Sequence, residues 1–80
     1  MMTYRPQVKF RRTAPRLWLG NGFGYRPAEY AVVQDGVDIA ELVCSKQGDW
    51  WRAYMEGEKW LDAPTLADLK IAVRDALNTA

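Results

Sequence analysis

The chain has 80 residues, one cysteine and no histidine, which excludes an internal disulfide and a Cys/His zinc site built by this chain alone, and removes the most common general base. Its formal net charge is only +1, but residues 1–28 carry six cations and no acid, whereas the remaining 52 residues carry all ten carboxylates and five cations. The two parts therefore have net charges of +6 and −5. Such an asymmetry suggests that the basic segment meets something acidic, either a partner or a nucleic acid.

The composition is that of one folded domain, with 49% hydrophobic residues and four tryptophans. A domain of this size buries only about 60% of the surface of its unfolded chain, so we expect at least one exposed aromatic side chain. No apolar run reaches the roughly 18 residues that a membrane span needs, and no apolar segment of signal-peptide type follows the amino terminus. We therefore expect a cytoplasmic protein without membrane contact.

Within the basic segment, residues 7–11 alternate like an edge strand, and residues 16–19 could form another short strand. Residues 20–24 contain alternating glycines. A phosphate-binding glycine loop needs a helix directly after it, whereas a strand is expected here, so a flexible turn or hairpin tip is favoured. Aromatic anchoring should order part of the segment, and the candidate anchors are Phe10, Trp18 and Phe23.

Residues 29–63 are expected to form an antiparallel sheet. Strands are expected where β-branched and aromatic residues gather, and Asp35-Gly36 between two such runs is a strong hairpin signal. All the connections are short, which favours a meander. The expected strands are residues 30–34, 37–44, 50–55 and, as a short fourth, 60–61, with a loop at 45–49 and a turn at 56–59.

The last expected element is a helix at residues 65–79, packed on one side of the sheet. Thr65 is a good N-cap, and Asp68 three residues later makes a weaker form of capping box. Ile71 lies off the apolar stripe, and we expect it to pack in a second layer rather than to be an exposed contact. The stripe itself contains Leu66, Leu69, Val73, Ala76 and Leu77, with Ala72 at its edge. The predicted fold is therefore a single α+β domain, an antiparallel meander sheet of three to five strands with one C-terminal helix packed on one face.

The third predicted strand carries candidate contact residues on one face. Trp50, Arg52 and Tyr54 alternate and so share a face, while Trp51, Ala53 and Met55 share the other. If the helix packs on the second set, the first set presents an aromatic–arginine–aromatic row that could bind phosphates or carboxylates. Alternatively, the basic segment covers this row and is held in place by it. The pattern leaves both arrangements open.

Catalytic chemistry has little support in the sequence. Most carboxylates lie in predicted turns, where acidic residues are ordinary surface groups, and no calcium-loop spacing is present. Cys44 has no histidine to activate it, so a small buried apolar role is expected. We therefore expect a protein that is not an enzyme and that holds neither a metal nor a cofactor.

Two resemblances arise from these elements. The meander and helix of residues 30–79 resemble, in their order, the AP2-type and integrase arm-binding domains, in which a three-stranded sheet enters a DNA groove. That resemblance implies DNA contacts by Trp50 and Arg52, although the net charge of −5 on this part of the chain opposes them.

The second resemblance lies in the hairpin of residues 48–62, with its Gly-x-Trp, Ala-Tyr and Lys-Trp-x-Asp elements. It is similar to a hairpin of small phage-encoded anti-CRISPR proteins that act on type I surveillance complexes. This resemblance implies a non-enzymatic inhibitor that occupies a surface used by target DNA or by a nuclease.

We therefore expect an inhibitory binding protein, anti-CRISPR-like, that docks on a type I CRISPR surveillance complex and blocks target DNA binding. The alternatives are a sheet-based DNA-binding domain of AP2 or integrase-arm type and a phage structural or accessory interaction protein. The expected partner is a protein or nucleoprotein complex with an acidic surface, with direct nucleic-acid binding as the second choice. In a further alternative, the basic segment folds over the acidic body and is neutralised internally. The expected contact residues are Arg11, Arg12, Arg16, Trp18, Trp50, Arg52 and Tyr54.

Overall fold

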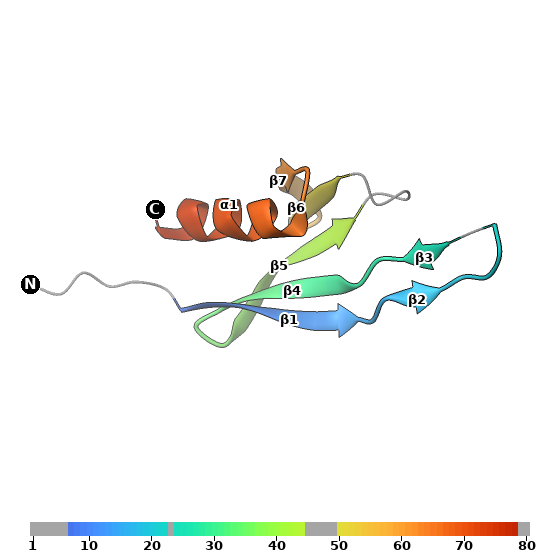
Figure 1. The fold of residues 1–80 in the computed structure, drawn as a ribbon. Helices are drawn as coiled ribbons and strands as arrows, with labels where there is room; N and C mark the ends of the chain where they lie inside the picture. Colours follow the sequence, from blue (N-terminus) through green and yellow to red (C-terminus); the bar gives the residue numbers. More distant parts are fainter. Residues whose placement is uncertain (1–6, 23, 45–49, 79–80) are drawn as a thin grey trace, which may run out of the picture.

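The computed structural model describes residues 7–22, 24–44 and 50–78, which form an α+β fold (Figure 1). A five-stranded antiparallel sheet has the order β1-β4-β5-β6-β7, and a second sheet consists of β2 and β3. One helix, α1, packs against the larger sheet. The elements are β1 (Val8–Ala14), β2 (Leu17–Trp18), β3 (Tyr25–Arg26), β4 (Glu29–Gln34), β5 (Val37–Cys44), β6 (Trp51–Met55), β7 (Glu58–Ala63) and α1 (Leu66–Asn78).

The strands β1 to β4 form one long hairpin. β1 pairs with β4, and after a bulge at Thr13 the small β2–β3 pair continues the same ribbon to the glycine turn. The ribbon beyond the bulge, residues 14–22 and 24–28, is called the arm below. Figure 1 shows the arm extending past the rest of the sheet and past the end of α1. The arm therefore projects from the folded body.

Two tight turns set the register of the meander. Asp35 and Gly36 have φ values of 51° and 84°, and Glu56 and Gly57 have values of 54° and 80°. Positive φ at both central residues is the requirement of a type I′ turn, whose twist matches that of antiparallel strands. The hairpin predicted at Asp35-Gly36 is thus confirmed. The second turn is shorter than expected, since β7 already begins at residue 58.

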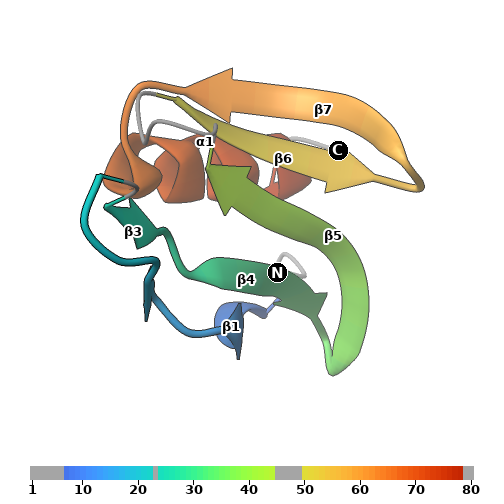
Figure 2. The same ribbon diagram turned by 90° about the vertical axis from the view of Figure 1, so that its right-hand side faces the viewer.

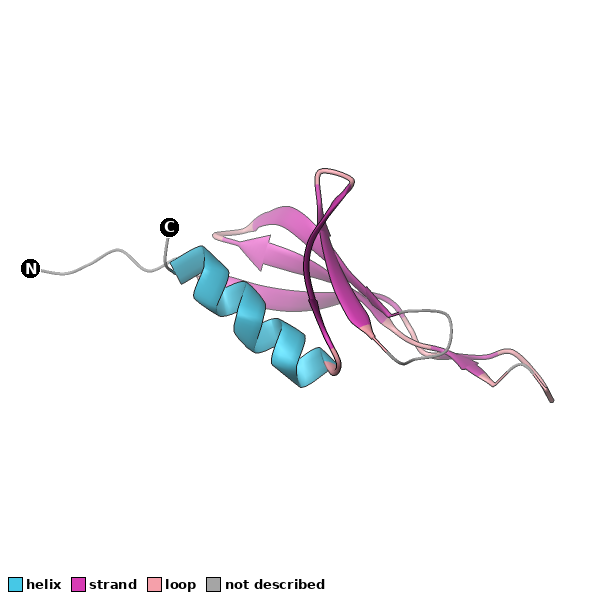
Figure 3. Ribbon diagram, turned by 90° about the horizontal axis from the view of Figure 1, so that it is seen from above, coloured by secondary structure: helices cyan, strands magenta, loops and turns pink. Residues whose placement is uncertain are grey.

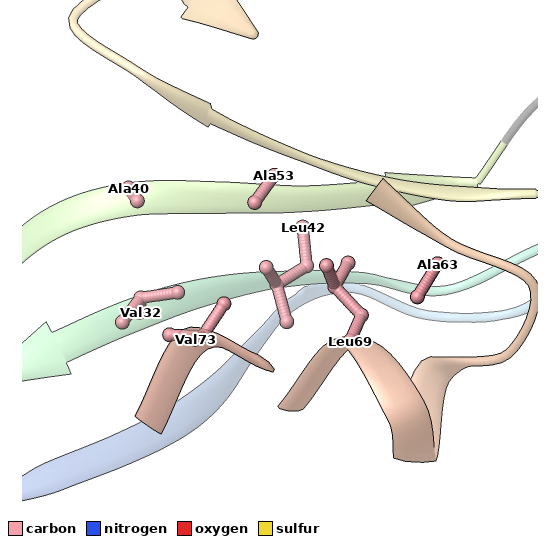
Figure 4. Close-up of a cluster of buried hydrophobic side chains, with 7 residues drawn as sticks. All are labelled: Val32, Ala40, Leu42, Ala53, Ala63, Leu69 and Val73. Atoms are coloured by element: carbon pink, nitrogen blue, oxygen red, sulfur yellow. The ribbon is translucent and has the colours of Figure 1, made fainter. Parts of the chain in front are cut away.

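The core lies between the sheet and α1 (Figures 3 and 4). Leu69 and Val73 of α1 point into a sheet surface that holds three alanines, and the short alanine side chains leave room for the helix. Thr65 caps the helix as predicted, because its Oγ1 accepts a hydrogen bond of 3.1 Å from the backbone N–H of Asp68. The buried cluster contains Val32, Ala40, Leu42, Ala53, Ala63, Leu69 and Val73.

The predicted fold class is confirmed, and three details differ from the expectations. The basic segment contributes an edge strand, β1, to the sheet, so the sheet is wider than residues 29–63. β7 is a full strand rather than a short one, and Figure 2 shows it at the opposite edge from β1. Ile71 is 58% exposed, so its expected packing was wrong: no second layer lies outside α1 in the described part of the chain. Phe23 and the loop at residues 45–49 lie outside the described residues.

Candidate binding surfaces

The arm carries a cluster of exposed aromatic and aliphatic side chains. Trp18 and Tyr25 are opposite each other in the β2–β3 pair, with ring centroids 4.8 Å apart, and they are 52% and 51% exposed. The guanidinium carbon of Arg16 lies 4.0 Å from the centre of the Tyr25 ring, a cation–π contact. Leu17 and Leu19 are also exposed. The arm cluster, as we call the three side chains in mutual contact, is Arg16, Trp18 and Tyr25.

Glycine residues form the turn predicted for residues 20–24 at the end of the arm. The backbone N–H of Leu19 donates to the carbonyl of Gly24 at 2.8 Å, and the N–H of Gly24 donates to the carbonyl of Gly20 at 3.3 Å. Gly20 and Gly24 have φ values of 101° and 71°, which side-chain-bearing residues rarely adopt. These contacts close the ribbon just beyond Trp18 and hold the arm cluster at its outer end.

Internal neutralisation of the basic segment is limited in the part of the chain that the structure describes. The Arg11 guanidinium pairs with the Asp38 carboxylate at 2.6 Å, and both side chains remain more than half exposed. Arg12, Arg16 and Arg26 make no ion pair within residues 7–22, 24–44 and 50–78. The positive charge of the arm therefore remains available to a partner.

A second group of cations lies on the side of the sheet that α1 covers. The ammonium nitrogen of Lys70 is 5.3 Å from the ring centre of Phe10 and 5.1 Å from that of Tyr30. The guanidinium carbon of Arg74 lies 4.9 Å from the Phe10 ring, and that of Arg12 lies 5.9 Å from the Tyr30 ring. We call Phe10, Arg12, Tyr30, Lys70 and Arg74 the helix-side cluster.

The opposite face of the sheet, called the open face below, has the reverse charge. A shallow cavity of about 530 Å³ lies there, and its lining includes four carboxylates but no cation. Tyr54 and Ala31 contribute to its wall. The carboxylates are Glu29, Asp38, Glu41 and Glu56. The protein thus presents an acidic cavity on its open face, a cationic helix side and a basic arm.

The structure distributes the predicted contact residues of β1 and the arm over three places. Arg16 and Trp18 both contact the Tyr25 ring in the arm cluster. Arg12 faces the helix side, whereas Arg11 pairs with Asp38, because consecutive strand residues point to opposite faces. The basic segment is therefore not one uniform charged patch.

The predicted row on the third strand is only partly assembled. α1 packs on the face of Ala53, as expected, with Trp51 and Met55 against the same core. Arg52 is exposed on the other face, Tyr54 is half-buried in the cavity wall, and Trp50, 48% exposed, precedes β6. The described part of the basic segment pairs at the sheet edge with β4, two strands away from β6, so it does not cover Arg52.

Sequence reasoning missed Lys70 and Arg74 as functional candidates. Their spacing of four residues places them on the same side of a helix, which the sequence does indicate. Their position over Phe10 depends on the pairing of β1 with β4, and the sequence indicates the strand but not its partner. Cys44 is half-buried at the end of β5 rather than fully buried.

Comparison with known proteins gives no match: no family model, no curated protein and no solved structure matches the chain. Among the described residues, no helix has the length and apolar character needed to cross a membrane. Within the same residues, no group of three or more His, Cys, Asp or Glu side chains is placed to hold a metal ion. Any functional conclusion therefore depends on the surfaces described above.

Proposed function

We propose that the protein is a non-enzymatic binding protein that docks through its arm on an acidic surface of a protein or nucleoprotein complex. The observation that supports this proposal is the arm cluster, where Trp18 and Tyr25 expose about half of their surface beside a cation that no described carboxylate neutralises. Trp, Tyr and Arg are the residue types that dominate the energy of protein interfaces. The contact between the two rings and the contact of the Arg16 guanidinium with Tyr25 restrict these side chains before binding. Less side-chain conformational entropy is therefore lost when the arm docks.

The specific form of this proposal is an anti-CRISPR-like inhibitor that docks on a type I surveillance complex and blocks target DNA binding. Its support is the resemblance of the hairpin at residues 48–62, which corresponds to β6 and β7, together with the exposed arm. The arm would supply the anchoring contact and its arginines would orient the protein on the acidic partner.

A DNA-binding sheet of AP2 or integrase-arm type has less support from the geometry. In that arrangement the open face would enter the groove, with Trp50 and Arg52 as contacts. The cavity on this face is lined by four carboxylates, which would repel phosphates at close range. The arm and the helix side are the surfaces whose charge suits an anion.

The test is affinity capture from a lysate that carries a type I CRISPR system, with the full chain as bait. Wild type is compared with Arg16→Glu/Trp18→Ala, which alters the arm cluster, and with Arg52→Ala as the matched control on the open face. We expect the wild type and Arg52→Ala to capture surveillance subunits and the arm variant to lose them.

Two results would contradict the proposal at different levels. If the wild type captures no surveillance subunit, the specific inhibitor function is wrong. If the arm variant captures the complex as well as the wild type does, docking through the arm is wrong, and loss in Arg52→Ala alone would place the contact on the open face.

A further inference from the structure

The helix-side cluster is a separate cationic surface that docking through the arm does not require. Its cations come from two elements far apart in the sequence, Arg12 from β1 and Lys70 and Arg74 from α1. All of them lie within 6 Å of the centre of one of two aromatic rings, Phe10 or Tyr30. Three cations therefore lie over two aromatic rings, which carry no net charge.

No described carboxylate balances these charges. Arg12, Lys70 and Arg74 make no ion pair within the ranges that the structure describes. The ring faces hold the cations by cation–π attraction, worth about 0.5–1 kcal/mol each at exposed sites, but rings carry no net charge. Binding of an external anion would thus reduce the repulsion among the three cations. The rings hold the cations in position before the anion binds.

The three cations are connected through the two rings that they share. Lys70 lies over both rings, Arg74 lies over Phe10 and Arg12 lies over Tyr30, so Lys70 links the other two cations. From Arg12 the chain runs into the arm, and Arg16 is no more than about 14 Å further along the backbone. In Figure 1, β1 and β4 continue into the arm in the same direction.

Three cations beside a strand that leads to exposed aromatic rings fit one class of ligand best. Proteins that bind single-stranded nucleic acid combine a positive groove for the backbone with aromatic side chains on which bases stack. The helix-side cluster supplies the cations, and Trp18, on the arm that follows β1, supplies a half-exposed ring. We propose that the helix side of the protein binds a single-stranded nucleic acid, with phosphates on Arg74, Lys70 and Arg12 and a base on Trp18.

The charge of the open face disfavours nucleic-acid binding on that side of the sheet. Four carboxylates line the cavity on the other surface of the same sheet, and one of them, Asp38, is paired with Arg11. The other three would repel phosphates there. A nucleic acid is thus directed to the helix side although the net charge of the whole chain is only +1. The same separation explains how a chain with ten carboxylates can present an anion-binding surface.

The test is fluorescence anisotropy of a labelled oligothymidine of about 20 nucleotides with the purified full chain at low salt. Lys70→Ala/Arg74→Ala removes two cations, and alanine is the best helix former, so α1 should be preserved. Arg74→Gln is a milder second variant at an exposed helix position, and Arg52→Ala is the control on the open face. Circular dichroism confirms the folding of each protein.

We expect measurable binding by the wild type that weakens steeply with salt, at least tenfold weaker binding by the double variant, and no change in Arg52→Ala. Loss of two phosphate contacts should also reduce the slope of log K against log salt by about 1.4. Arg74→Gln should weaken binding several-fold. A duplex of the same length should bind more weakly, because its bases cannot stack on Trp18.

Several results would overturn the inference. Absence of wild-type binding to the oligothymidine at about 50 mM salt contradicts it. Equal affinities of the folded double variant and the wild type contradict the assigned site, and equal binding of the duplex contradicts the single-stranded ligand. Full competition by polyglutamate at equal charge would identify an acidic protein as the ligand instead. None of these outcomes requires a surveillance complex, so the result is independent of the capture experiment.

Discussion

Replacing Leu69 by alanine should remove a large part of the stability of the domain. Leu69 is fully buried where α1 meets the sheet, and its neighbours in the core include Ala53 and Ala63. These side chains are short and are held on paired strands, so they cannot move to fill the space. The cost should therefore be about 3–5 kcal/mol, the upper part of the range for buried Leu→Ala changes.

That cost is large for a chain of this size. At about 0.05–0.15 kcal/mol per residue, 80 residues have a total unfolding free energy of about 4–12 kcal/mol. Urea denaturation followed by tryptophan fluorescence measures the change, because Trp51 and Trp60 pack against the core and report on its loss. We expect a lower midpoint with an unchanged slope, since the surface exposed on unfolding stays nearly the same.

The matched control is Ile71→Ala on the same helix. Ile71 is 58% exposed, so its replacement should cost less than about 1 kcal/mol. If Ile71→Ala costs as much as Leu69→Ala, the packed face of α1 is not the one described and the reasoning fails.

Three further changes test local features. Thr65→Ala should cost about 1 kcal/mol of unfolding free energy by removing the hydrogen bond to the Asp68 N–H, and Thr65→Ser should restore it, as thermal denaturation would show. Gly57→Ala should cost about 1–2 kcal/mol in urea denaturation, purely from backbone strain, because φ is 80° and no atom lies within 4 Å of an added Cβ. Asp38→Asn, which breaks the pair with Arg11, should cost at most about 1 kcal/mol at low salt and less at high salt.

Each of these expectations has a clear opposite. A Thr65→Ser protein as unstable as Thr65→Ala would show that the hydroxyl does not cap α1. An unchanged stability of Gly57→Ala would mean that the turn adopts another conformation. A salt-independent loss in Asp38→Asn would point to a packing role for Asp38 in place of charge pairing.

The parts of the fold that depend on local chemistry could be predicted from the sequence. Asp35-Gly36 supplies the backbone freedom of a type I′ turn, and Thr65 supplies a cap, so neither needs distant contacts. The exposure of Ile71 depends on whether another layer exists outside α1. Helical periodicity shows which residues lie off the stripe but not what covers them, which is why that expectation failed.

The candidate surfaces were less predictable because they combine distant elements. Consecutive residues of a strand point to opposite faces, so Arg11 and Arg12 of β1 lie on different faces of the sheet. The same alternation was used to group Trp50 with Arg52. The contact of Lys70 and Arg74 with Phe10 depends on β1 joining β4, at the edge nearest those helix residues. Strand alternation at residues 7–11 indicates a strand but not its partner, so this surface needed the structure.

The order of the strands has a consequence for how the chain reaches its native state. Every neighbouring pair in the large sheet is joined by the next hairpin along the chain, including β1 and β4 through the arm. Pairing therefore proceeds by closing short loops, which favours rapid folding. However, α1 follows every strand of the sheet in the chain, and until it docks, the apolar surface around Leu42 and Ala53 is open to water. During synthesis the sheet must remain uncovered until residue 78 is available, and that interval is when self-association of the nascent chain is most favoured.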